Sequence, residues 1–149
     1  MMDSQLSEEY IDACLSAKQT LRFLPEPPPE IQKRHIYIIK TLYNLSKELT
    51  EVRVSDIAGK IGVTLPSITK NIALLENLGY IKKESNAEDK RVVNIQLTEK
   101  GLSLHQKIVY DFHHKNSQIL KDIPEEDIRL TIKTIYRIYA LMEQAHSLD

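Results

Sequence analysis

Two short helical segments separated by a glycine turn place the tightest constraint on how this chain folds. Residues 54–63 (VSDIAGKIGV) carry a small apolar face and stop at Gly62, and we expect Val63 to pack the turn. Residues 64–80 (TLPSITKNIALLENLGY) begin with Thr64 as an N-cap, and Pro66 falls in the first turn, where its missing N–H is harmless. In this second segment, apolar residues recur every three or four positions, at Ile68, Ile72, Leu75 and Leu78. This pattern predicts a helix-turn-helix.

A short β-hairpin is expected directly after the second of these helices. Residues 80–85 (YIKKES) and 92–97 (VVNIQL) have strand character, and the second segment alternates with a period of two. The polar stretch between them ends in Lys90 and Arg91. The hairpin therefore presents two basic residues at its tip.

Helices are predicted on both sides of this unit. An apolar seam before residue 24 ends at the proline run of residues 25–29, and a second helix then leads into the helix-turn-helix. After the hairpin, Thr98 caps a long helix, Pro124 breaks it, and a last helix carries another apolar stripe.

The predicted fold class is therefore mainly α with a small β-hairpin wing, in one domain over residues 1–149. Residues 31–100 form the winged helix-turn-helix, and residues 1–24 and 101–149 supply flanking helices. The apolar seams of those flanking helices are longer than such a unit can cover. The simplest way to cover these seams is to pack them against the same surface of a second copy. We therefore expect a symmetric homodimer in which the flanking helices are dimerisation helices.

Composition narrows the class of protein without naming a ligand. The formal net charge is −1, so the whole chain has no electrostatic preference for nucleic acid, although residues 60–83 hold four lysines and one acid. The single cysteine, Cys14, excludes an intrachain disulfide and predicts a reducing compartment. No apolar run approaches the roughly 18 residues of a membrane span, and no signal-peptide pattern is present. We therefore expect a cytoplasmic protein.

Sequence motifs of enzymes are missing. With only four glycines there is no glycine-rich phosphate loop, and G-x-S-x-G, H-E-x-x-H and paired C-x-x-C are all absent. We predict neither catalysis nor a cofactor.

The polar face of the second helix has the chemistry to bind DNA, because hydroxyl, amide and ammonium groups contact phosphates and base edges. The residues concerned are Thr64, Pro66, Ser67, Thr69, Lys70 and Asn71. A solvated helix face and a charged surface turn have similar compositions, so a winged-helix module for protein–protein contact is the alternative. A helix-turn-helix followed directly by a basic-tipped hairpin favours double-stranded DNA.

In this interpretation a recognition helix, about 64–78, enters the major groove and a wing, about 85–92, reaches the minor groove. Lys90 and Arg91 make the wing contact. The negative potential of DNA repels the carboxylate of Asp89, so we do not expect this residue to contact bases. We expect it to pair with a basic group and to hold the conformation of the wing.

The same run of residues resembles the MarR family of winged helix-turn-helix transcriptional regulators over nearly the whole chain. The matching motifs are D-x-R at residues 89–91, L-T-x-x-G at 97–101 and L-x-x-x-G-[YL]-[IV] at 75–81. The resemblance implies an obligate dimer on a palindromic operator, with Arg91 in the minor groove and residues 64–71 over the major groove. It also implies repression relieved by a small molecule, a metal or an oxidant.

Residues 37–70 also resemble the DNA-binding half of the metal-dependent diphtheria-toxin-repressor family, so a metal-responsive repressor is a further alternative. The candidate ligands are Cys14, His35, His105, His113 and His114. Adjacent histidines on a helix point about 100° apart and do not easily share a metal. We therefore predict no metal site, and we interpret Cys14, on the apolar seam, as a packing residue.

A small-molecule effector is expected in a crevice between the terminal helices and the winged region. Aromatic and apolar residues that would line it are Tyr10, Leu21, Tyr37, Tyr110 and Phe112.

Overall fold

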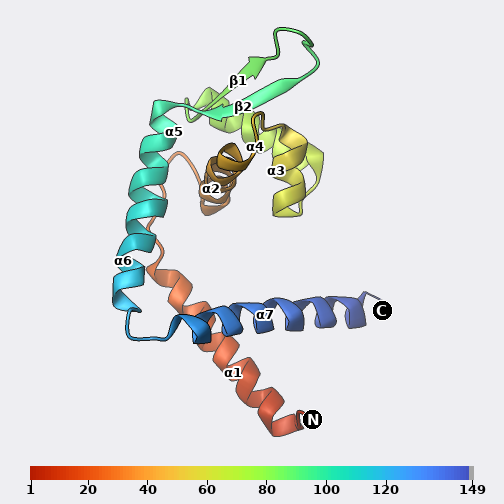
Figure 1. The fold of residues 1–149 in the computed structure, drawn as a ribbon, viewed down its shortest axis with the longest axis vertical. Helices are drawn as coiled ribbons and strands as arrows, with labels where there is room; N and C mark the ends of the chain where they lie inside the picture. Colours follow the sequence, from red (N-terminus) through yellow and green to blue (C-terminus); the bar gives the residue numbers. More distant parts are fainter. Residues whose placement is uncertain (148–149) are drawn as a thin grey trace. The chain divides into compact units, whose positions relative to one another are not determined.

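The computed structural model describes residues 1–147, and its contacts divide the chain into two compact units, residues 1–112 and the residues from His113 onward. The first unit holds α1 (Ser4–Thr20), a 3-10 turn (Leu21–Phe23), α2 (Lys33–Glu48), α3 (Val54–Ile61), α4 (Leu65–Asn77), β1 (Ile81–Ser85), β2 (Val93–Leu97), α5 (Glu99–Leu104) and a π-helical stretch (His105–Tyr110) (Figure 1). α6 (Asp111–Ile119) crosses the boundary, and α7 (Glu125–His146) lies in the second unit. The predicted fold class, mainly α with a β-hairpin wing, is confirmed.

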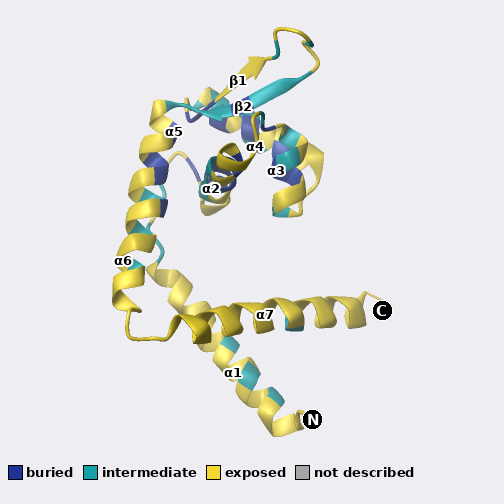
Figure 2. Ribbon diagram, viewed as in Figure 1, coloured by how far each residue is buried: buried dark blue, intermediate teal, exposed yellow. Residues whose placement is uncertain are grey.

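The core lies where α2, α3, α4, the hairpin and α5 meet, and the buried residues on these elements stand out in Figure 2. Its fully buried members include Ile39, Leu42, Ile57, Ile68, Ile72, Leu75, Ile81 and Ile95. Three- and four-residue spacing on α2 and α4 turns these side chains to one face of each helix. Burial of the apolar stripe of α4 leaves the opposite face of this helix exposed.

The turn between α3 and α4 needs a left-handed residue, and Gly62 supplies it with φ 81°. The amide of Gly62 donates to the carbonyl of Ala58, which closes α3. We expected Val63 to pack this turn, but its side chain is 42% exposed. That expectation was wrong. The amides of Gly62 and Val63 both donate to the carbonyl of Ala58, so backbone hydrogen bonds close the turn.

The two strands pair antiparallel, with Lys82 opposite Gln96. The segment before α3 pins the second strand, because the amide of Ile95 donates to the carbonyl of Val52 at 2.7 Å. In return, the amide of Val52 donates to Oδ1 of Asn94 at 2.9 Å. The base of the hairpin is thus fixed to the helical core.

The helix after the hairpin differs from the prediction. It begins as expected, with the Thr98 hydroxyl accepting from the amide of Gly101. From His105 to Tyr110 it widens into π-helical geometry, which the sequence did not predict. His105 and Val109 in this stretch are buried, whereas Leu102, before it, is 47% exposed.

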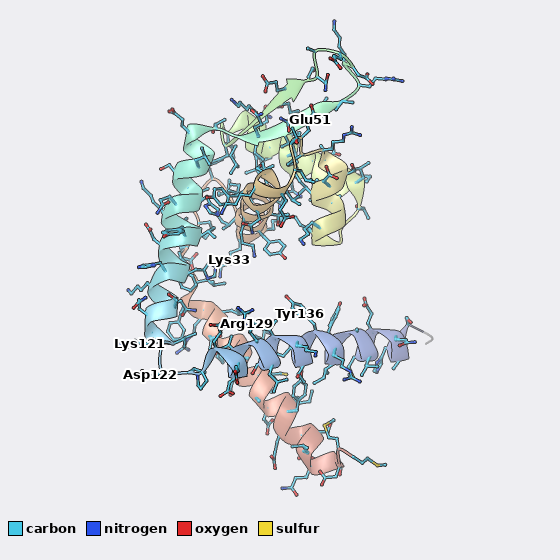
Figure 3. All side chains as sticks on the ribbon, viewed as in Figure 1. Lys33, Glu51, Lys121, Asp122, Arg129 and Tyr136 are labelled. Atoms are coloured by element: carbon cyan, nitrogen blue, oxygen red, sulfur yellow. The ribbon has the colours of Figure 1, made fainter. Side chains whose placement is uncertain are left out.

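The outer helices carry apolar side chains that this chain does not cover. α1 and α7, both described in full, bury none of their residues. Tyr136, labelled in Figure 3, projects from α7 and is 71% exposed. The large exposed apolar residues of α7 are Ile128, Leu130, Ile132, Ile135, Tyr136, Tyr139, Leu141 and Met142. Among the described residues, no helix has the length and apolar character to cross a membrane.

Candidate nucleic-acid interface

The start of α4 is built as the sequence indicated. Thr64 adopts an extended N-cap conformation, and its hydroxyl accepts from the amide of Ser67 at 3.4 Å. Pro66 occupies the first turn, where helix amides have no intrahelical partner. The amide of Ile68 donates to the carbonyl of Thr64 at 3.2 Å, so Thr64 closes the first turn with both its hydroxyl and its carbonyl.

The face of α4 opposite its buried stripe is open to solvent. Five of the six predicted contact residues on it are exposed: Thr64, Pro66, Ser67, Thr69 and Lys70. The Thr69 hydroxyl donates to the carbonyl of Leu65 at 2.9 Å and keeps its oxygen free to accept. Lys70 makes no salt bridge with any residue in the described part of the chain.

The sixth residue, Asn71, is half-buried and tied to α2. Its Oδ1 lies 2.9 Å from Nε2 of His35, and its Nδ2 donates to the carbonyl of Ser67 at 3.0 Å. Its amide is therefore already hydrogen-bonded on both sides. The structure gives Asn71 a part in orienting the helix, and its contact with DNA stays a prediction.

Two arginines that sequence inspection missed lie beside the predicted residues. Nε of Arg34, at the start of α2, donates to Oδ1 of Asn71 at 3.4 Å and adds a cation next to α4. Arg53, before α3, is exposed and acts electrostatically on Asp89 of the wing. Neither position belongs to a helix-turn-helix motif, so only the tertiary arrangement identifies them.

An ordered turn forms the wing tip. Oδ1 of Asn86 accepts from the amides of Glu88 and Asp89 at 2.8 and 3.3 Å. Nδ2 of Asn86 donates to Oε1 of Glu51 at 2.9 Å, which joins the loop to the segment before α3. The amide of Val92 donates to the carbonyl of Asp89 at 3.0 Å. The loop is thus shaped by its own polar groups.

Asp89 pairs with a basic group, as the sequence predicted, and the structure identifies that group as Arg91. Nε and Nη2 of Arg91 donate to Oδ1 and Oδ2 of Asp89 at 3.1 and 3.2 Å, and the Arg91 amide donates to Oδ1 at 3.0 Å. These hydrogen bonds, first of all those from the Arg91 side chain, hold the pKa of Asp89 below its usual value. The Arg91 side chain is 91% exposed, and Lys90 is exposed beside it.

The residues considered as metal ligands or sensors do not assemble. Across the described residues, no three histidines, cysteines or acids are close enough to hold a metal ion. Both ring nitrogens of His35 are occupied, by Asn71 and by the amide of Gln32, which donates to Nδ1 at 2.9 Å. Cys14 is half-buried and interacts with the hydroxyl of Tyr10, whose pKa is raised by that hydrogen bond.

Of the residues expected around an effector crevice, Tyr37 lines one of the described cavities. This cavity, of about 130 Å³, lies beside α3 and is also lined by Thr41, Asn44 and Lys60. Leu21 and Tyr110 are exposed, at 56% and 55%.

A family model described as a winged helix DNA-binding domain matches residues 32–101, the segment from α2 to the start of α5. These residues constitute such a domain. The match covers the predicted recognition helix and the whole hairpin.

Solved structures of similar fold extend this likeness over the rest of the chain. FabT of Streptococcus pneumoniae, in complex with DNA, is 23% identical with a TM-score of 0.65, over 96% of this chain and 99% of FabT. MarR of Staphylococcus aureus, in complex with salicylate and kanamycin, is 18% identical with a TM-score of 0.68, over 95% of each chain. The PcaV transcriptional regulator of Streptomyces coelicolor, with its natural ligand, is 15% identical with a TM-score of 0.64, over 94% of this chain and 96% of PcaV.

These similarities confirm the resemblance that the sequence motifs indicated. The chain has the fold of MarR-family regulators, with a winged helix DNA-binding domain inside it. Among the proteins compared, PcaV is a transcriptional regulator.

Proposed function

We propose that this chain, which has the MarR-family fold and a winged helix DNA-binding domain at residues 32–101, is a homodimeric transcriptional regulator that binds a palindromic operator. The observation that carries the proposal is the exposure of DNA-compatible groups on both α4 and the wing. Ser67, Thr69 and Lys70 are exposed on the helix, while Lys90 and Arg91 are exposed at the hairpin tip.

In this proposal the N-terminal half of α4 enters the major groove, where Ser67, Thr69 and Lys70 contact phosphates and base edges. Arg91 reaches the minor groove, whose negative potential attracts a guanidinium group. Asp89 holds that guanidinium until it meets DNA, and it keeps the arginine side chain from adopting many conformations in the free protein.

The proposal of a homodimer is supported by the apolar side chains of α1 and α7. A monomeric soluble protein rarely exposes a contiguous apolar surface of this kind. A second copy offers the same surface, so a two-fold axis would pair the outer helices and set two α4 helices on successive turns of a palindromic site. A small effector would then regulate DNA binding, as ligand-bound structures of this fold illustrate.

DNA binding is tested by fluorescence anisotropy with the DNA upstream of the protein's own gene. For the wild type we expect an affinity that falls steeply with salt, because phosphate contacts release counterions. Lys70→Ala and Arg91→Ala should each weaken binding and lower the slope of log affinity against log salt by about one.

The matched control is Lys133→Ala, which removes a lysine of the same exposure class from α7. It should leave the affinity unchanged. Loss of binding in the control, or normal binding in both Lys70→Ala and Arg91→Ala, would show that the interface is assigned to the wrong surface.

A further inference from the structure

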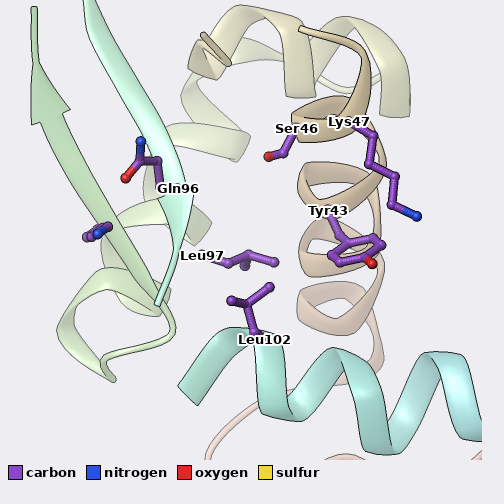
Figure 4. A pocket seen from close by; sticks show the side chains of 7 residues that line it. Tyr43, Ser46, Lys47, Gln96, Leu97 and Leu102 are labelled. Carbon is purple, nitrogen blue, oxygen red and sulfur yellow. The ribbon is translucent and has the colours of Figure 1, made fainter. Parts of the chain in front are cut away.

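Several large apolar side chains of the winged helix DNA-binding domain are exposed, and their surroundings differ. Leu102 lines a cavity of about 310 Å³ between α2, the base of the hairpin and α5, which Lys47 and Lys82 also line (Figure 4). Val63 and Leu65 lie instead on either side of the α4 N-cap, and they are 42% and 51% exposed. These two side chains therefore flank the start of the helix that is proposed to enter the major groove.

The backbone around Val63 and Leu65 is held by hydrogen bonds. The amide of Val63 donates to the carbonyl of Ala58 at 3.2 Å, and the carbonyl of Leu65 accepts from the Thr69 hydroxyl at 2.9 Å. Leu65 lies three positions before Ile68, which is buried, so the core contacts of α4 begin about one turn after it. The two side chains are thus presented to solvent from a hydrogen-bonded turn, ahead of the part of the helix that packs on the core.

The charges around this pair favour an anionic partner. Between Ile57 and Leu75 the sequence has two lysines, Lys60 and Lys70, and no acidic residue, and both lysines are exposed. A purely apolar partner surface would separate these ammonium groups from water without giving them a counter-charge, which is unfavourable. The DNA major groove suits both kinds of group, because its phosphates lie beside base edges and thymine adds a methyl group to those edges.

We propose that Val63 and Leu65 determine the base preference of this chain, and that each contacts the C5-methyl group of a thymine in the major groove. The inference rests on the proposed function and adds a sequence requirement to the operator. Neither side chain can donate or accept a hydrogen bond, so a cytosine amino group or a guanine carbonyl facing it would lose water without gaining a partner. A thymine methyl group at the same place removes apolar surface of both molecules from water. The operator should therefore carry thymines at the bases that face the start of α4.

The test removes the methyl group from the DNA. A duplex that binds the full-length protein is selected from random sequences, and each of its thymines is replaced in turn by deoxyuridine, which lacks only that methyl group. We expect two thymines in each half-site at which the replacement weakens binding of the wild type about three- to four-fold, as expected when the burial of one methyl group is lost. Fluorescence anisotropy at constant salt measures the affinities.

Variants of the protein then assign each contact to a residue. Leu65→Ala should bind the thymine and deoxyuridine duplexes equally well at one of these positions, and Val63→Ala should do so at the other. Leu74→Ala is the matched control, because Leu74 is an exposed leucine later in the same helix. This variant should keep the wild-type preference for thymine at both positions. Thermal unfolding shows whether each variant is folded.

The inference is overturned if no replacement by deoxyuridine weakens binding of the wild type. The role of either residue is overturned if its alanine variant keeps the wild-type preference, or if that variant changes sedimentation and not DNA binding, because the side chain would then contact another copy of the chain. In each of these cases the proposed function stands, since the protein still binds the selected duplex. If the wild type selects no duplex from the random sequences, the proposed function itself fails, and the base preference fails with it.

Discussion

Nε2 of His35 and Oδ1 of Asn71 are 2.9 Å apart, so a buried imidazole in α2 holds a side chain of α4. The other ring nitrogen, Nδ1, accepts from the amide of Gln32, which requires it to be unprotonated. Nε2 therefore carries the hydrogen and donates it to Asn71. The neutral ring thus links the start of α2 to the middle of α4 and fixes the rotation of the helix proposed to read DNA.

Asn71→Ala should destabilise the protein, because it leaves the buried Nε2–H of His35 without an acceptor. We expect a loss of about 1–3 kcal/mol in the free energy of unfolding, measured by urea denaturation. Thr69→Ala, two residues away on the exposed face, is the control and should change the free energy by less than about 0.5 kcal/mol. Equal losses of stability in the two variants would show that the hydrogen bond to His35 does not contribute to the free energy of unfolding.

Low pH should weaken the hydrogen bond between His35 and Asn71. The pKa of His35 is lowered, mainly because burial disfavours the charged ring, and the nearby Arg34 cation acts in the same direction. Between the lowered pKa and the ordinary value of 6.5, the unfolded chain binds more protons than the folded one, so stability rises with pH. The contribution of His35 to the free energy of unfolding is fully present above the ordinary pKa of 6.5. It is lost as the pH falls through the lower pKa that His35 has in the folded protein.

This pH dependence is checked by urea unfolding of the wild type and of His35→Gln at about pH 7.5 and about pH 5.5. The wild type should lose more stability between the two conditions than the variant does. The other histidines are present in both proteins, so their titration cancels in the comparison. An identical loss in the two proteins would contradict the assignment.

Gly101→Ala should be strongly destabilising. A Cβ at this buried position in α5 would overlap the carbonyl oxygen of Tyr80 and would lie 3.1 Å from Cδ2 of Leu97. Since the clash is with backbone, α5 must shift away from the hairpin, and we expect a cost of about 1–3 kcal/mol. Thermal and urea unfolding measure it.

Gly59→Ala on α3 is the matched control, because nothing lies within 4 Å of the added Cβ. Alanine has the higher helix propensity, so this variant should be more stable than the wild type by about 0.5–1 kcal/mol. If both variants are destabilised, the glycine at position 101 is needed for a reason other than its close approach to the carbonyl oxygen of Tyr80.

A charge placed on the apolar face of α7 should dissociate the proposed dimer. Ile132 and Ile135 are 49% and 45% exposed, and an aspartate at either position would be buried without a partner in a dimer interface. Sedimentation equilibrium should show a dimer for the wild type and a shift toward monomer for Ile132→Asp. Lys133→Asp alters the adjacent residue, which is not part of the apolar stripe, and this variant should remain dimeric. A monomeric wild type at micromolar concentration would contradict the dimer itself.

Local patterns in the sequence were sufficient to predict the helix-turn-helix and the wing. Thr64, Pro66 and Gly62 act through their immediate backbone neighbours, so their roles follow from helix caps and turn geometry. The sequence also indicated that Asp89 would pair with a basic group, and the structure identifies that group as Arg91, two residues away.

Other features depended on contacts between residues distant in the chain. The π-helical stretch has no simple periodic signature, and the burial of His105 on Tyr43 appears only when α2 and the long helix meet. The turn at Val63 was misjudged because an apolar residue next to a glycine turn does not reveal which neighbour, if any, covers it.

By itself, the sequence determined the order of elements, the apolar face of each helix and the chemistry at the start of α4 and at the wing tip, because those properties arise from residues a few positions apart. Only the tertiary structure decided that Asn71 is held by His35, that Arg34 and Arg53 join the candidate interface, and that Lys47 and Lys82 line one cavity. The physical reason is that hydrogen bonds and charge interactions act over a few ångströms, and sequence separation does not predict which distant side chains folding brings within that range.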